Sequence, residues 1–321
     1  MKHRTLAVGC WIGVVAGLMW VGAAAVRAFE PGPPEVSGAV AAAEPITPLP
    51  PAPAADPRRV ALGELLFSDT RLSHDNNRSC TTCHDVRGNG ATHRSRDSTP
   101  DGTDLSFNTT TVFNAALSFR LGWEGKYRTL ESQIEALLLN PQIMGCAPET
   151  IAQRLRGDQV VSSEFQAAYG REPDAANILD ALATFERTLT TPGSRFDRWL
   201  EGDITALSGR ELQGYALFKS LGCIACHQGM NVGGNLFERQ GIFHPLARPD
   251  PAVLRVPSLR NVATTAPYFH DGSAPTLQVA VRKMGLGQLN TTLTDEQIEA
   301  IVAYLRTLTG TYRGAPVGAQ E

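Results

Sequence analysis

The chain has no run rich in lysine or arginine, and its formal net charge at pH 7 is only −3. Proteins that bind nucleic acid neutralise its phosphates with clustered basic side chains, so we expect no nucleic-acid partner. The sequence also lacks any convincing alternation of apolar and polar residues, the pattern that indicates half-buried strands. Its 321 residues therefore predict a mostly α-helical protein of about two domains with long loops.

Cysteine is scarce as well, and the six cysteines differ in their surroundings. Cys10 lies in an apolar N-terminal run. Four others form two copies of one five-residue motif, Cys80-Thr-Thr-Cys-His84 and Cys223-Ile-Ala-Cys-His227. Cys146 is left without a disulfide partner, and we expect a partly buried thiol there.

The repeated motif, Cys-x-x-Cys-His, is typical of c-type haem attachment. Its two thiols add to the vinyl groups of one porphyrin, and the histidine that follows binds the iron. A redox Cys-x-x-Cys motif does not need that histidine, and a zinc site would need a second ligand pair that is missing nearby. We therefore predict two covalently bound haems c. The predicted attachment and iron-binding residues are Cys80, Cys83, His84, Cys223, Cys226 and His227.

The N-terminus has the pattern of a secretory signal peptide. Residues 2–4 are basic, residues 6–26 are apolar, and small residues up to Ala28 offer a cleavage site before Phe29. We predict that residues 1–28 are removed and that the protein is periplasmic, where haems of this type are attached. An uncleaved membrane anchor is the alternative, since the apolar run approaches membrane-spanning length.

The composition changes along the chain and predicts its domains. Residues 29–57 are rich in proline and alanine and predict a semi-extended linker. Residues 58–200 and 201–312 are each predicted to form a cytochrome c-like haem domain, and residues 313–321 a short tail. Both domains carry Gly-x-x-Leu-Phe shortly before their haem motif, which is a weak internal repeat.

Helix signals are clearest in the second half of the chain. Thr294 and Gln297 form a capping box ahead of an apolar stripe that ends at Gly310. Ser208 and Glu211 form another capping box before the second Gly-x-x-Leu-Phe segment. These helices support the mostly α fold.

Several longer stretches, among them "LGELLFSDTRLS", "NTTTVFNAALSFRLGWEGK", "NPQIMG" and "VPSLRNVATTAPYFHDGS", carry a more specific signal. Over residues 58–312 the chain resembles the bacterial dihaem cytochrome c peroxidases, in the superfamily that also holds the methylamine-utilisation enzyme MauG. The resemblance implies that the first haem reacts with H2O2. It also implies that the second receives electrons from a small donor protein, a cytochrome c or a cupredoxin. Members of the family are often homodimers.

The resemblance also implies a sixth ligand for the second haem. Met284 stands at the position of the family's axial methionine, and a methionine ligand raises the reduction potential of a haem. MauG has a tyrosine there, so the methionine favours the peroxidase branch. Met230 is a poor competitor because it follows His227 too closely, and the alternative for Met284 is plain core packing.

The first haem lacks an obvious sixth ligand. The family's displaceable histidine would fall near residues 100–101, where this chain has Pro100 and Asp101. His93 is the only histidine in that loop after His84, and we expect it to be solvated rather than bound to iron. A five-coordinate first haem is therefore the favoured interpretation.

Five further residues match functional positions of the family. The resemblance implies that Trp123 lies between the haems as a stepping point for electrons and that Gln133 lies in the distal pocket of the first haem. It implies that Asn108, Thr265 and Pro267 hold a calcium ion through oxygen atoms, which suits that hard cation. A core tryptophan is the alternative for Trp123.

One position departs from the family. Ile143 in "NPQIMG" replaces the glutamate that moves a proton between the peroxide oxygens, and Gln142 is no strong acid or base. Glu135 or Glu149 would have to be brought in by a shifted loop. The leading hypothesis is a cytochrome c peroxidase; the alternatives are MauG-like oxidation of a partner protein and a non-enzymatic electron carrier.

Overall fold

The computed structural model describes residues 44–319. The predicted signal peptide and residues 29–43 of the predicted linker lie outside the described residues. Within residues 44–319 no helix is long and apolar enough to cross a membrane.

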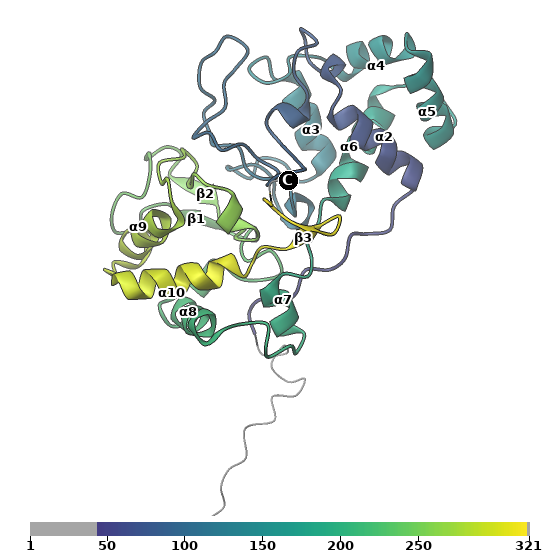
Figure 1. Cartoon of the computed structure of the whole chain (residues 1–321). Coiled ribbons are helices and arrows are strands. Elements are labelled where there is room, and N and C mark those ends of the chain that lie inside the picture. Colours follow the sequence, from purple (N-terminus) through teal and green to yellow (C-terminus); the bar gives the residue numbers. More distant parts are fainter. Residues whose placement is uncertain (1–43, 320–321) are drawn as a thin grey trace, which may run out of the picture. The chain divides into compact units, whose positions relative to one another are not determined.

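The first group of helices builds the N-terminal core. Helix α6 packs against α2, α3 and α4, and α2 also contacts α5 (Figure 1). The core is filled by aliphatic and aromatic side chains such as Leu66, Phe67, Ile178 and Phe185. The helices are α2 (Pro57–Phe67), α3 (Leu130–Leu139), α4 (Pro148–Arg156), α5 (Gln159–Tyr169) and α6 (Ala175–Thr188).

The second group surrounds a separate core in which α8 and α10 pack together. Thr294 caps α10 with the predicted box, and Ser208 does the same for α8. The helices are α7 (Arg195–Leu200), α8 (Gly209–Ser220), α9 (Leu277–Leu289) and α10 (Asp295–Arg306). A mostly α fold is thus confirmed.

Strands are short and few among the described residues. β1 (Phe237–Arg239) pairs antiparallel with β2 (Val253–Arg255), and β3 (Thr311–Tyr312) pairs with β4 (Ala315–Pro316). These pairs hold loops together and form no layer of the core. Short 3₁₀ turns, η1 (Thr70–Leu72), η2 (Cys80–Thr82), η3 (Ala115–Leu117), η4 (Cys223–Ala225) and η5 (Val262–Thr264), complete the elements.

The internal repeat has a packing explanation. A Cβ atom at Gly63 in α2 would overlap with the carbonyl oxygen of Ala181 in α6, and one at Gly214 in α8 would overlap with that of Ala300 in α10. Each repeat therefore supplies the glycine that lets two helix backbones touch. In each pair the haem motif follows the glycine-bearing helix, α2 or α8, in the chain.

Residues 44–49, which we call the strap, belong to the predicted semi-extended linker and pack on the second core. Ile46 and Leu49 are buried, with 0% and 4% of their surface exposed, and Ile46 belongs to the second core. The Glu44 carboxylate accepts hydrogen bonds from Tyr215 Oη and Lys219 Nζ on α8. This part of the linker is docked on the C-terminal core.

The strap also joins a buried ion pair. Arg260 donates to Asp197 Oδ1 at 2.7 Å, and both side chains are almost fully buried. Arg260 Nη2 donates to the carbonyl of Thr47 at 2.9 Å, and Gly229 N donates to that of Pro45 at 2.8 Å. A buried pair satisfied in this way is costly to break, because the partner left behind is an uncompensated charge.

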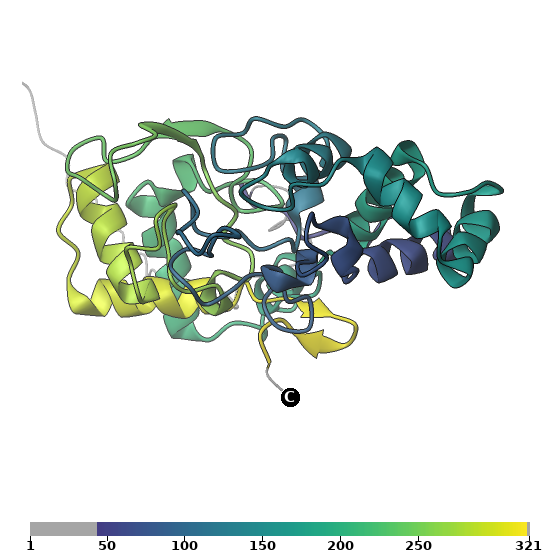
Figure 2. The same cartoon turned by 90° about the horizontal axis from the view of Figure 1, so that it is seen from above.

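The C-terminal residues of the described chain pack against the N-terminal core. Val317 is buried in the N-terminal core, and Arg313 pairs with Glu64 on α2 at 2.6 Å. Figure 2 shows this yellow segment leaving α10 and lying beside the N-terminal helices. The predicted tail therefore packs on the first group of helices, while the strap packs on the second.

Candidate functional site

The first haem motif begins in η2. His84 Nδ1 donates a hydrogen bond to the carbonyl of Gly90 at 3.1 Å, so Nε2 is the nitrogen left to bind iron. Gly90 has φ +72°, and a Cβ there would contact Thr111 Oγ1 at 2.5 Å. The tight turn after the motif thus orients the imidazole.

The second haem motif has the same design. It begins in η4, and His227 Nδ1 lies 3.4 Å from the carbonyl oxygen of Val232, to which it donates. A Cβ at Gly233 would overlap with the carbonyl oxygen of Pro257. The backbone can therefore close around His227 only because glycine follows.

The protonation states suit haem. Burial lowers the pKa of both His84 and His227, the latter to about 4, so both rings are neutral and can bind a metal. Burial raises the pKa of the Cys83 and Cys223 thiols to about 11. A redox-active Cys-x-x-Cys thiol has a lowered pKa instead. The described residues also contain no group of three or more His, Cys, Asp or Glu side chains able to hold a metal ion.

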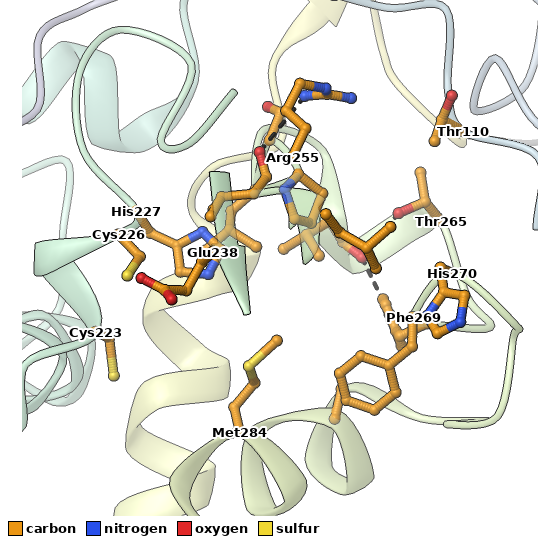
Figure 3. A pocket seen from close by; sticks show the side chains of 18 of the residues that line it. Thr110, Cys223, Cys226, His227, Glu238, Arg255, Thr265, Phe269, His270 and Met284 are labelled. Carbon is orange, nitrogen blue, oxygen red and sulfur yellow. Dashed lines mark hydrogen bonds between the residues drawn. The ribbon is translucent and has the colours of Figure 1, made fainter. Parts of the chain in front are cut away.

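A cavity of about 360 Å³ opens beside the second motif. Cys223, Cys226, His227 and Met284 line it, together with apolar side chains such as Val281. Figure 3 shows the two thiols and the imidazole on one side and Met284 rising from α9 on another. An apolar space with an imidazole, a thioether and two attachment thiols fits a haem c with two protein ligands.

The structure separates the two candidate methionines. Met284 is partly buried and lines the cavity. Met230 is 40% exposed and is absent from the residues that line the cavity. Of the two, only Met284 shares the cavity with His227.

Trp123 lines the same cavity and is held by hydrogen bonds of its side chain and its backbone. Its Nε1 donates to the carbonyl of Asn108 at 2.8 Å, and its own carbonyl accepts from Arg255 N at 2.8 Å. Its ring lies edge-on to His270, with ring centroids 6.2 Å apart. A tryptophan fixed in this way suits a defined electron path better than a loosely packed one.

The three residues matched to calcium also line this cavity. The Asn108 side-chain nitrogen donates to the carbonyls of Arg94 and Ser95, both at 3.1 Å, which leaves Oδ1 as the atom available to a cation. Thr265 and Pro267 stand close by in sequence on the segment after η5. Oxygen atoms are the donors that calcium prefers, and all three residues carry at least one.

Glu135 and Glu149, the two acids that a shifted loop could bring towards position 143, are both exposed. Ile143 is partly buried against the N-terminal core. Gln133 lines the cavity from α3, and Glu135 is exposed two positions further along that helix, which places it on another face. Glu149 is exposed in the first turn of α4. His93 is exposed as well, which agrees with a solvated loop histidine.

Sequence reasoning missed Glu186, a carboxyl group near the first motif. Burial raises the pKa of Glu186 to about 8, and its charge also helps to raise the pKa of the Cys80 thiol. In the sequence, Glu186 is a single glutamate beside Phe185, near the end of a helix face that is otherwise apolar. Periodicity alone does not show how deeply such a carboxyl is buried.

The two motifs, the neutral histidines and the helical scaffold define a c-type cytochrome with two haems. A family profile described as "Di-haem cytochrome c peroxidase" matches residues 57–205, and one described as "Cytochrome c" matches residues 212–309. Cytochrome c551 peroxidase of Nitrosomonas europaea is 37% identical over 85% of this chain and 86% of its own length. The chain belongs to the family of di-haem cytochrome c peroxidases.

Two further similarities place the chain within the family. Methylamine utilization protein MauG of Methylorubrum extorquens is 32% identical over 70% of this chain and 68% of its own length. The crystal structure of a MauG-like protein associated with microbial copper homeostasis matches with a TM-score of 0.71 and 25% identity, over 82% of this chain and 93% of that one. The predicted resemblance is thus confirmed, and with it an oxidoreductase that carries two haems c.

Proposed function

We propose that this protein is an exported cytochrome c peroxidase. It takes two electrons from a small donor protein, a cytochrome c or a cupredoxin, and with two protons reduces one H2O2 to two molecules of water. The observation that carries the proposal is that Trp123 and Gln133, the residues matched to the electron path and to the first haem, line the same cavity as His227 and Met284. The names of the relatives support the same reaction.

The second haem is the electron entry. Its iron would be held by His227 and Met284, and two protein ligands limit the change in geometry between oxidation states. The Met284 thioether favours the reduced state and raises the potential. Trp123 then offers an aromatic step towards the first haem, where His84 is the iron ligand.

The first haem is the peroxide site. Haem iron bound to His84 supplies, when present, the centre at which the O–O bond is reduced. Gln133 can donate a hydrogen bond to bound peroxide from its amide. Ile143 cannot move a proton, so proton delivery is the weak step of this chain.

A calcium ion is proposed to bind both domains, 58–200 and 201–312, and so to fix their relative position. Asn108 belongs to the first and Thr265 and Pro267 to the second, and all three line one cavity. Asn108 also accepts from Trp123, so a cation there would stiffen the electron path. The periplasm, which the predicted signal peptide indicates, is rich enough in calcium for a site of modest affinity. A homodimer is part of the same proposal.

A second function has one specific observation in its favour. The replacement of the acid by Ile143, with Glu135 and Glu149 exposed, disfavours rapid turnover of free peroxide. A slow peroxide reaction suits MauG-like oxidation of a partner protein, and MauG is among the relatives. A carrier without enzymatic activity would need neither peroxide nor a protein substrate.

The deciding experiment follows the haem spectra of the loaded protein in stopped flow. The protein is pre-reduced with a small cytochrome c and mixed with one equivalent of H2O2. A peroxidase oxidises two equivalents of donor for the one equivalent of H2O2 that it consumes. Slow, unordered bleaching of the haems without donor oxidation would contradict the proposal and favour the carrier.

A further inference from the structure

The segment 239–246, which we call the clasp, lies against the helix that carries Met284. It follows β1 and contributes Gln240, Ile242 and Leu246 to the lining of the haem cavity. Met284 and Gln288 line the same cavity from α9. Residues four apart lie on one helix face, so Gln288 stands one turn beyond Met284 on the face that the clasp covers.

Gln288 binds the clasp with both ends of its amide. Its Oε1 accepts a hydrogen bond from Ile242 N at 3.1 Å, and its Nε2 donates to the carbonyl of Arg239 at 3.0 Å. The side-chain amide thus both accepts from and donates to the clasp backbone, as the backbone of a neighbouring strand does. A bond at each end fixes both the distance and the rotation of the amide.

Backbone contacts on α9 support this pairing. Phe243 N donates to the carbonyl of Gly287 at 2.9 Å. A Cβ at Gly287 would lie 3.1 Å from the carbonyl oxygen of His244, so a larger residue would push the clasp away. Lys283 Nζ donates weakly to the carbonyl of Leu246, at 3.4 Å.

We propose that Gln288 is a positioning residue for the second haem: it keeps the clasp closed over α9 and thereby keeps the Met284 sulfur in the cavity. The inference rests on the proposed function, because it takes Met284 as the sixth iron ligand. Without Gln288 the clasp loses two of its hydrogen bonds to α9, those of Ile242 N and of the Arg239 carbonyl. An open clasp leaves room for Met284 to swing away and for a small ligand to enter.

The chain provides a matched control on the same helix. Gln278 also donates from its side-chain amide, but to Glu299 on α10 at 3.1 Å, away from the clasp. Gln288→Leu and Gln278→Leu are therefore the same chemical change at two ends of α9. Met284→Ala serves as the reference for a haem that has lost its sulfur ligand.

The experiment titrates each haem-loaded, oxidised variant with imidazole and follows the sulfur-to-iron absorption band. We expect Gln288→Leu to lose half of the band at an imidazole concentration on the order of tenfold lower than wild type. This factor corresponds to the loss of one or two neutral hydrogen bonds. Gln278→Leu should titrate like wild type.

Three results would overturn the inference in different ways. A wild-type titration of Gln288→Leu means that the clasp does not hold Met284. Equal weakening in Gln278→Leu means that any loosening of α9 has the same effect. A band that survives in Met284→Ala means that the ligand assignment itself is wrong.

A second variant, Ile242→Pro, tests the proposal if Gln288→Leu fails to fold. Ile242→Pro removes the N–H that Gln288 accepts while leaving Gln288 in place, and Ile242 is half exposed. The expected result is again an earlier loss of the band. A wild-type titration of this variant overturns the proposal.

Discussion

Ile143 shows how much one side chain can decide at the residue scale. It occupies a position where the family resemblance implies a carboxylate, and it packs against the N-terminal core rather than opening to solvent. The neighbouring acids Glu135 and Glu149 are both exposed. The chain therefore has an apolar side chain at the position where the resemblance implies a proton-transferring acid.

Ile143→Glu should raise the rate of peroxide consumption. A positioned acid or base contributes roughly 10²–10⁴-fold, so a gain of about tenfold or more is expected even if the fit is imperfect. The measurement is the initial rate against H2O2 with a pre-reduced donor. Ile143→Gln has a similar size without a titratable proton and should stay near wild type. A wild type as fast as Ile143→Glu would mean that another group already delivers the proton.

Glu186 predicts a dependence of stability on pH. Its pKa is raised from 4.5 to about 8 by burial, so the folded protein holds a proton that the unfolded chain has lost. Stability contributed by this proton is present below pH 4.5 and is lost as pH rises towards 8, by at most about 1.4 kcal/mol per pH unit. Glu186→Gln should therefore gain stability relative to wild type across this window.

The check is the unfolding midpoint of both proteins at several pH values between 5 and 8. The difference between them should widen as pH rises and level off above pH 8. Glu135→Gln, on an exposed side chain, controls for a general charge effect. A constant difference across the window would show that Glu186 titrates normally in the folded protein.

At the scale of elements, the two glycine-mediated helix pairs place the haem motifs. Gly63 and Gly214 lie where α2 meets α6 and where α8 meets α10. Helix α8 ends at Ser220, directly before the turn that begins at Cys223, so an error in the α8–α10 crossing would move the second pair of attachment cysteines. Helix α2 ends at Phe67, and η1 lies between it and Cys80.

Gly214→Ala should destabilise the protein although alanine is the better helix former. The added methyl would overlap with the Ala300 carbonyl, and overpacking of this kind costs about 1–3 kcal/mol. Gly209→Ala on the same helix adds a methyl into open space and should be neutral or slightly stabilising. Denaturant unfolding of the haem-loaded variants measures both. A stable Gly214→Ala protein would show that α8 and α10 can move apart at little cost.

At the scale of the whole molecule, each end of the described chain packs against the core that is farther from it in sequence. The strap precedes the first group of helices but packs on the second core, and Val317 follows the second group but packs on the first. Each end thereby adds contacts between segments far apart in sequence. The described protein should therefore unfold in a more cooperative way than two haem domains joined by a free linker.

Ile46→Ala tests this coupling. Ile46 is fully buried in the second core, and truncation of a buried isoleucine to alanine costs about 2–5 kcal/mol. Thr47→Ala is the control, because Thr47 is exposed and its carbonyl still binds Arg260 after the change. Unfolding is followed by the absorption of both haems. Equal stability of the two variants would mean that the strap is dispensable.

The sequence alone determined which cofactor this protein attaches, because the residues that attach it lie in short, local motifs. Two cysteines and a histidine must be adjacent to attach one haem, so spacing is enough to find both sites. Helix caps and apolar stripes are local as well, and they predicted the mostly α fold. The family resemblance added residues such as Met284 and Trp123, and both line the cavity.

Only the tertiary structure decided which of the remaining residues meet. The docking of Ile46, the burial of Glu186 and the pairing of Gln288 with the clasp all join segments distant in sequence. A proline- and alanine-rich composition predicts a tether, because it does not reveal a complementary groove elsewhere in the chain. Burial of this kind is a property of the whole fold, since the free energy of each side chain depends on the neighbours that other segments bring to it.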